Sequence, residues 1–194
     1  MRATPENWMY PPAEGWTYDQ VKDLALPRDW ELLGGKIAVR GRTSWWHDQV
    51  RDGIYYSLRN AKREPFTVNI ERSTMIDESH APTPDVVVFD KRGLDLRTLD
   101  CTPAGKAVLA VEVVSPGSRA EDHYYKHALY GYAKIDHYWR VERGEDDLPV
   151  VHEFWQHQEV NWYIPRPERP THTGTLKTEV PFPIEIDLRS LIEI

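Results

Sequence analysis

The sequence has little of two things that would assign it to a specialised class of protein: cysteine and positive charge. Cys101 is the single cysteine among 194 residues, so no intramolecular disulfide can form, as is typical of a reducing compartment. Lysine and arginine number 24 against 31 aspartate and glutamate residues, for a net charge of −7. The chain therefore lacks the basic excess of proteins that coat nucleic acid, although a local basic patch or a bridging metal ion would still allow binding.

Long apolar runs and common catalytic motifs are also missing. The most apolar run, residues 107–114, is too short to cross a bilayer, and residues 1–10 contain no signal peptide. We find no Gly-x-Ser-x-Gly, Gly-x-Gly-x-x-Gly, phosphate-loop or His-Glu-x-x-His motif, and the eight histidines are scattered. We therefore expect a cytoplasmic protein that makes no membrane contact and belongs to none of these motif-defined enzyme classes.

The length and composition are those of one globular domain. Residues 1–15 are rich in proline and predict an irregular N-terminal arm, and residues 16–194 predict the domain itself. Two helices come first and strands follow, with one strand–helix–strand unit over residues 107–142. This order predicts an α/β fold with a mixed sheet flanked by helices.

Local patterns place the elements. A capping box beginning at Thr17 predicts a short helix over residues 18–26, and the Gly34-Gly35 pair predicts a hairpin turn. Ser44 is the expected N-cap of a second helix, and a third is expected from residue 118 to about 134. Residues 165–175 are expected to form a loop, and residues 183–194 a closing strand and a helical turn. Further strands are predicted over residues 67–76, 84–89, 107–114, 137–142, 150–155 and 160–164.

Glu112 is the most informative residue because it lies inside the apolar run Ala-Val-Leu-Ala-Val-Glu-Val-Val. A carboxylate in a strand covered on both faces is costly unless it is paired or binds a metal. Asp85 begins another apolar strand, directly after Pro84. If these strands are neighbours, the two carboxylates meet at one edge of the sheet, where they suit Mg²⁺ or Mn²⁺. The alternative is that Glu112 pairs with an arginine and Asp85 caps a turn.

Five other residues could support such a site. Asp122, Lys126 and Tyr130 are spaced to share one helix face, so Lys126 either reaches back toward Glu112 or forms a surface ion pair with Asp122. Glu31, among apolar residues beside a turn, is either a further acidic ligand or an exposed residue. His47 lies near the start of the second helix and could point into a cleft.

Several segments together resemble one protein family. They are Trp30-Glu31-Leu-Leu-Gly-Gly-Lys-Ile, Pro84-Asp85, Val-Glu112-Val-Val-Ser-Pro116, Asp122-x-x-x-Lys126-x-x-x-Tyr130, Tyr138-Trp139 and Phe182-Pro183-Ile-Glu-Ile-Asp-Leu, with His47 at the place of a family histidine. In order and spacing they resemble the Uma-two family, a bacterial group classed with the restriction endonucleases. The resemblance covers about residues 16–192.

The resemblance implies the restriction-endonuclease-like fold of the PD-(D/E)XK superfamily and a Mg²⁺- or Mn²⁺-dependent nuclease. The expected substrate is nucleic acid, with DNA favoured, although members of the superfamily cut different nucleic acids. The resemblance also implies that Asp85, Glu112 and the Val113 carbonyl hold the metal, and that a lysine two residues after the glutamate assists the attacking water. Here that position is Val114. The resemblance offers Lys126 as the replacement.

The supporting roles follow from the same resemblance. Glu31 would be a further ligand or would position water, Asp122 would hold Lys126 in place, and His47 and Tyr130 would complete the site. Cutting both strands of a duplex makes a homodimer reasonable. The alternative, favoured by Val114, is a catalytically inactive nuclease fold that acts as a binding or interaction module. A third interpretation is a metal-dependent hydrolase of small phosphoesters.

Overall fold

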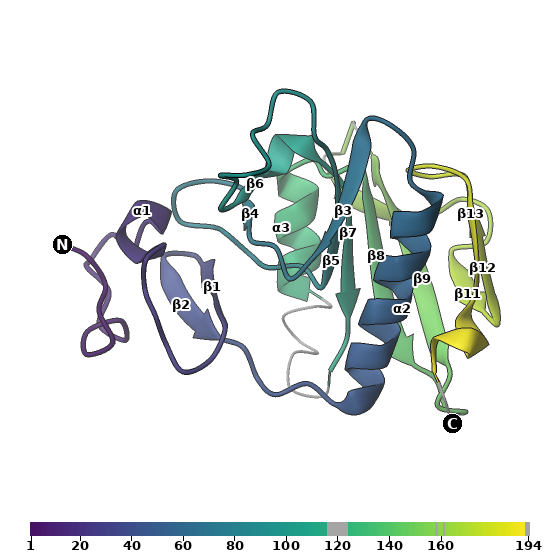
Figure 1. The fold of residues 1–194 in the computed structure, drawn as a ribbon, viewed down its shortest axis with the longest axis horizontal. Coiled ribbons are helices and arrows are strands. Elements are labelled where there is room, and N and C mark those ends of the chain that lie inside the picture. Colours follow the sequence, from purple (N-terminus) through teal and green to yellow (C-terminus); the bar gives the residue numbers. More distant parts are fainter. Residues whose placement is uncertain (116–123, 158, 161, 193–194) are drawn as a thin grey trace.

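The centre of the fold is a mixed sheet (Figure 1). The computed structural model describes residues 1–115, 124–157, 159–160 and 162–192. Within them, six strands run in the order β10-β9-β8-β7-β5-β3, and β11 extends the sheet by pairing with β9. The strands are β3 (Phe66–Ile70), β5 (Val86–Asp90), β7 (Ala107–Val113), β8 (His137–Arg143), β9 (Pro149–His157), β10 (Trp162–Pro165) and β11 (Thr171–Thr173).

One pair of neighbours in this sheet, β7 and β8, is parallel, and every other described pair is antiparallel. Parallel neighbours need a crossover connection, and α3 (Lys126–Tyr132) lies in it. The predicted strand–helix–strand unit and the mixed α/β fold are therefore confirmed. The other helices are α1 (Tyr18–Val21), α2 (Trp45–Ala61) and the 3₁₀ turns η1 (Ala104–Lys106) and η3 (Leu188–Leu191).

The two faces of the sheet carry separate apolar cores because side chains alternate along a strand. On β5, Val86 and Val88 pack in the cluster that includes the apolar face of α2, whereas Val87 and Phe89 pack in the cluster that includes Tyr130 of α3. The helices α2 and α3 thus cover opposite faces (Figure 1). No helix in the described ranges is long and apolar enough to span a membrane.

Helix α2 follows its sequence pattern closely. The Ser44 hydroxyl accepts a hydrogen bond from the backbone N–H of His47 at 3.2 Å, which caps the first turn. Val50, Ile54 and Leu58 recur every four residues and are fully buried. The predicted helix and its N-cap are confirmed, and the cap fixes the position of His47.

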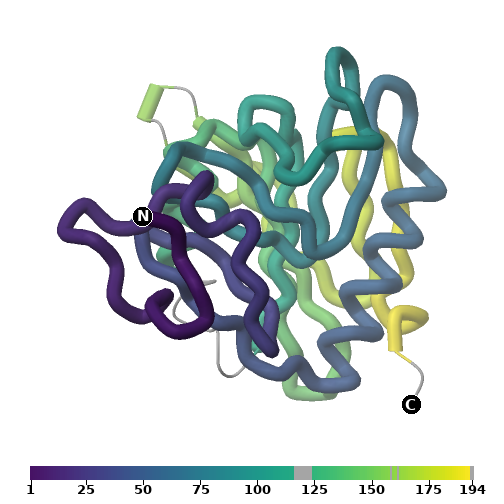
Figure 2. Tube along the Cα trace, turned by 60° about the vertical axis from the view of Figure 1, so that its left-hand side comes forward, coloured from purple at the N-terminus to yellow at the C-terminus, as the bar shows by residue number. Residues whose placement is uncertain are grey.

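A hairpin formed by β1 (Trp30–Leu33) and β2 (Lys36–Val39) stands apart from the main sheet at the N-terminal end (Figures 1 and 2). Gly34 and Gly35 form its turn with φ of 58° and 70°, values that glycine adopts without strain. The backbone N–H of Trp16 donates a hydrogen bond to the Gly35 carbonyl at 2.7 Å and holds the turn in place. The predicted hairpin is confirmed.

The remaining short strands complete the shell. The hairpin of β12 (Thr175–Thr178) and β13 (Ile184–Asp187) packs with η3 against α2. The predicted closing strand and helical turn are therefore confirmed. The strands β4 (Thr74–Met75) and β6 (Thr102–Pro103) form a two-stranded parallel sheet.

Three predicted boundaries are wrong. α1 ends at Val21, short of residue 26, because the backbone N–H of Leu24 donates to the Val21 carbonyl three residues earlier, at 2.8 Å, in place of the helical bond to residue 20. The strand expected over residues 67–76 is split where Glu71 adopts φ 45°. The loop expected over residues 165–175 contains β11, which pairs with β9.

Two further predictions stay open. The start of the third predicted helix, residues 118–123, lies outside the described residues. Residues 1–15 contain no helix or strand, but the domain boundary at residue 16 stays a prediction.

Glu153 on β9 explains why β11 forms. Its carboxylate is fully buried and lies 2.9 Å from Arg166 Nη1 and 3.1 Å from His172 Nε2, and it accepts a hydrogen bond from the Thr178 hydroxyl at 2.8 Å. These partners lie in the chain from the end of β10 to the end of β12. One buried carboxylate therefore holds this segment, including β11, against the sheet.

We predict that Glu153→Gln lowers the free energy of unfolding by about 3 kcal/mol, because it leaves Arg166 and His172 without their buried anion. Glu185→Gln is the matched control, since Glu185 forms an exposed pair with Lys177 and its loss costs less than about 1 kcal/mol. Urea unfolding at pH 7 measures both. Equal losses in the two variants would contradict the role given to Glu153.

Candidate active site

Asp85 and Glu112 meet at one end of the β5–β7 pair. Val86 lies opposite Val111 in the antiparallel register, so Asp85, one residue earlier, faces Glu112, one residue later. The Asp85 carboxylate accepts a hydrogen bond from the backbone N–H of Val113 at 2.7 Å. Both side chains are 1% exposed. The sheet thus brings together the two carboxylates singled out in the sequence.

Lys126 enters the site from α3. Its Nζ lies 3.2 Å from the Glu112 carboxylate and 3.3 Å from Glu31 Oε2. Glu31 comes from β1, and its carboxylate also accepts a hydrogen bond from the backbone N–H of Thr83 at 2.9 Å. The Tyr130 hydroxyl, one turn after Lys126, donates to Glu112 at 2.6 Å. Lys126 is therefore a buried cation between two carboxylates and no surface ion pair.

The usual lysine position is filled by an apolar group. Val114 is buried, and its backbone N–H donates to the Val141 carbonyl at 2.8 Å. The ammonium group near Glu112 is supplied by α3 and not by the strand itself. Asp122, expected to hold Lys126, lies outside the described residues, and Glu31 is the described residue that holds Lys126 from the side opposite Glu112.

Arg40 and His47 complete the surroundings of Asp85. Arg40 Nη2 lies 2.7 Å from Asp85 Oδ1, and His47 Nε2 lies 3.3 Å from Asp85 Oδ2. Arg40 directly follows β2, and its backbone N–H donates to the Asp29 carbonyl at 2.8 Å. Arg40 thus reaches the buried carboxylate of Asp85 from the end of the hairpin.

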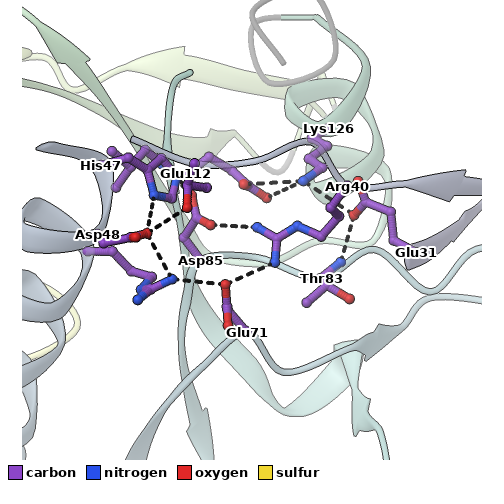
Figure 3. A network of polar contacts seen from close by, with 12 residues as sticks. Glu31, Arg40, His47, Asp48, Glu71, Thr83, Asp85, Glu112 and Lys126 are labelled. Carbon is purple, nitrogen blue, oxygen red and sulfur yellow. Dashed lines mark hydrogen bonds and ion pairs between the residues drawn. The ribbon is translucent and has the colours of Figure 1, made fainter. Parts of the chain in front are cut away.

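Figure 3 shows that these contacts continue into a ring of alternating charge. Each member contacts the next at 2.7 to 3.4 Å, and the sixth member returns to the first. The ring consists of Arg40, Asp85, His47, Asp48, Arg51 and Glu71. Asp85 is therefore held by cationic or protonatable groups from two separate elements, the N-terminal hairpin and α2.

The ring shifts the protonation equilibria of its members. Burial disfavours the charged form of Asp85, but His47, Arg40 and Lys126 outweigh it and hold the pKa of this carboxyl at about 2. Burial likewise opposes the protonation of His47, but the hydrogen bonds and charges of Asp85 and Asp48 raise its pKa above 6.5. Burial and then the charge of Glu112 raise the pKa of Tyr130. Asp85 is thus an anion and Tyr130 a neutral donor at pH 7.

The donor chemistry of this site suits a hard divalent cation. Asp85, Glu112 and the adjacent Val113 carbonyl are oxygen donors on neighbouring strands, and Mg²⁺ is commonly bound by one or two carboxylates together with water and phosphate. No group of three or more His, Cys, Asp or Glu side chains that could hold a metal is present in the described ranges. The site therefore fits an ion bound by two carboxylates. In this structure Glu112 is paired with Lys126, and Asp85 is paired with Arg40.

Two cavities open beside the site. The first, of about 560 Å³, is lined by Thr83, Glu71 and Arg40, and the second, of about 430 Å³, by Arg40 and Arg42 among others. Arg28, Asp29 and Arg40 line both cavities. The open space of these two cavities therefore reaches Arg40, the partner of Asp85, and does not reach Asp85 or Glu112 themselves.

A family model described as "Putative restriction endonuclease", that of Uma2, matches residues 18–189. The chain belongs to the Uma2 family. This confirms the resemblance found in the sequence. The match to Uma2 spans every site residue described above, from Glu31 to Tyr130.

Solved structures agree with the Uma2 fold. The chain is similar to a crystal structure of a putative nuclease belonging to DUF820 from Anabaena variabilis, with 15% sequence identity and a TM-score of 0.64. The alignment covers 90% of this chain and 96% of that chain. The chain matches none of the curated proteins by sequence. The likeness supports the nuclease-type fold of this Uma2 member.

We predict that Lys126→Met lowers the free energy of unfolding by about 3–5 kcal/mol at pH 7, because Glu31 and Glu112 lose their shared cation. Urea unfolding at pH 7 measures it. Lys91→Met, in a partly exposed pair with Glu64, should cost less than about 1 kcal/mol; equal losses in the two variants would contradict the pairing.

We predict that Asp85→Asn lowers the pKa of His47, because the hydrogen bond and charge of Asp85 are the chief groups that favour the imidazolium form. Asp48→Asn should lower it less, since Asp48 contributes after Asp85. Titration of the imidazole resonances by NMR measures both changes. An unchanged His47 pKa in Asp85→Asn would show that the ring is not closed in solution.

Proposed function

We propose that this protein is a divalent-metal-dependent nuclease that hydrolyses phosphodiester bonds of nucleic acid, with DNA as the expected substrate and Mg²⁺ or Mn²⁺ as the ion. The observation that carries the proposal is the placement of Asp85 opposite Glu112, with Lys126 against Glu112, in a Uma2 chain. Fold alone would not suffice, because one fold supports many functions.

Each residue has a distinct role in the proposed reaction. Asp85, Glu112 and the Val113 carbonyl would hold the ion, which when bound lowers the pKa of a water molecule and neutralises charge on the phosphate. Lys126 would orient the attacking water or stabilise negative charge on the phosphate in the transition state. Its Nζ can do so because Glu31 and Glu112 hold it from two sides.

The supporting residues keep the carboxylates in place. The Tyr130 hydroxyl fixes Glu112 through its 2.6 Å hydrogen bond, and His47 and Arg40 keep Asp85 ionised and oriented. The part proposed for Asp122 in holding Lys126, and the proposed homodimer, stay predictions.

A catalytically inactive nuclease fold that binds a partner is the alternative function. Two observations favour it: Val114 occupies the usual lysine position, and both carboxylates are paired with Lys126 or Arg40. A metal ion would compete with these cations for the same oxygens. The two proposals differ in one measurable property, which is turnover in the presence of metal.

We predict that the purified protein cleaves DNA in the presence of Mg²⁺ or Mn²⁺ and that Glu112→Gln lowers the rate at least about 100-fold. Calorimetric titration of each ion, followed by electrophoresis of single- and double-stranded substrates, measures binding and cleavage in the same preparations. Glu145→Gln, an exposed change of the same chemistry, is the control and should leave both unchanged.

The outcomes separate the two functions. Metal binding and cleavage that both vanish in Glu112→Gln support the nuclease. A folded wild type that neither binds the ions nor cleaves DNA supports the inactive binding module. Cleavage of mononucleotide analogues without cleavage of DNA would point to the small-phosphoester hydrolase.

A further inference from the structure

The carboxylates of the site are too deep for a rigid substrate to reach directly. Asp85 and Glu112 are each 1% exposed, and Glu31 is 6% exposed. The phosphates of a duplex lie on its outside, and bringing one of them below a protein surface requires bending, unpairing or extrusion of a nucleotide. These deformations are costly for paired strands and least costly for a strand that is already single.

Access to the site is on the side of Arg40. The cavities of about 560 Å³ and 430 Å³ adjoin there, since Arg28, Asp29 and Arg40 line both. Arg40 Nη2 is bonded to Asp85, and Nη1 lies 3.3 Å from Glu71 (Figure 3). Arg40 is therefore the cation that lies between the buried carboxylate of Asp85 and the open cavities.

The walls of these cavities carry more positive charge than the chain as a whole. Five cationic and four acidic side chains line them, whereas the whole chain has a net charge of −7. Two of the four acids are paired with arginines that line neither cavity, and two of the five cations, Lys22 and Arg40, are likewise paired with acids that line neither. The cations are Lys22, Arg28, Arg40, Arg42 and Arg72.

Aromatic rings accompany these cations. Tyr18 and Trp30 line the larger cavity and are half-buried. Cations interleaved with aromatic rings are the chemistry with which proteins hold single-stranded nucleic acid, because the cations follow the phosphates and the bases stack on the rings.

We propose that the two cavities form one groove for a single nucleic-acid strand and that Arg40, at its centre, binds the phosphate to be cleaved. The inference rests on the proposed nuclease function and names its substrate class. The strand contacts Arg28 and Arg42 as it passes through the groove. Its phosphate replaces the Glu71 carboxylate as the partner of the Arg40 guanidinium. Arg40 lines both cavities, so a strand bound through both is cleaved internally and needs no free end.

Binding without metal tests the groove independently of turnover. Fluorescence anisotropy in EDTA compares a labelled oligothymidylate with a blunt duplex of the same length, using the wild-type protein. We expect the single strand to bind at least about tenfold more tightly. Arg28→Ala should weaken the binding of the single strand about three- to tenfold. The slope of log affinity against log salt concentration should become shallower by about 0.7, as expected for one lost phosphate contact.

Arg63→Ala is the matched control. Arg63 is exposed and lies beyond the far end of α2, which is roughly 25 Å long at 1.5 Å per residue. Its removal should leave the affinity and the salt slope unchanged. Equal or tighter binding of the duplex, or equal effects of the two arginine substitutions, would overturn the groove.

Cleavage then distinguishes this inference from the proposed function. With Mg²⁺, a closed circular single strand should be cut and a relaxed closed circular duplex should resist. Preferential cutting of the duplex circle, or cutting restricted to linear strands, would overturn the inference while leaving a nuclease. Single-strand binding that depends on Arg28, with no cleavage of any substrate, would support the groove and overturn the proposed nuclease function.

Discussion

The arrangement of the site depends on a single pairing, that of β5 with β7. Their register sets Asp85 opposite Glu112 in the interior, where two carboxylates repel one another and lose their hydration. Such a pair is tolerated only if cations reach it. Lys126 from α3 and Arg40 from the N-terminal hairpin do so, and they tie these two otherwise separate elements to one end of the sheet.

The need to neutralise the buried carboxylates also explains why a lysine in α3 can take the place of one on the strand. The ammonium group near Glu112 has to match a position in space and not a position in the sequence. The face that Val114 shares with Glu112 on the strand supplies no cation, whereas α3 begins with Lys126 directly above the strand end. Supplying the cation from a helix leaves Glu112 as the one charged residue of β7, which suits a sheet covered on both faces.

Much of this could be predicted from the sequence. Strong periodicity identified α2, the apolar runs identified β5 and β7, and the buried carboxylates marked the site. Arg40 was missed because an arginine after a short exposed strand has no local signal, and its partners Asp85 and Glu71 lie 45 and 31 residues away in the chain. β11 was missed for the same reason, since a segment rich in Pro and Thr has no local strand signal. It pairs with β9 because the Glu153 carboxylate binds His172 within β11, Arg166 before it and Thr178 after it.

The N-terminal hairpin adds no net charge to the site. It contributes one acid, Glu31, and one base, Arg40, so its total charge at the site is zero. Displacing the hairpin would leave the summed charge of the site unchanged, but it would separate Asp85 from Arg40 and Lys126 from Glu31. The two buried ion pairs thus constrain the position of the hairpin, although its net charge does not.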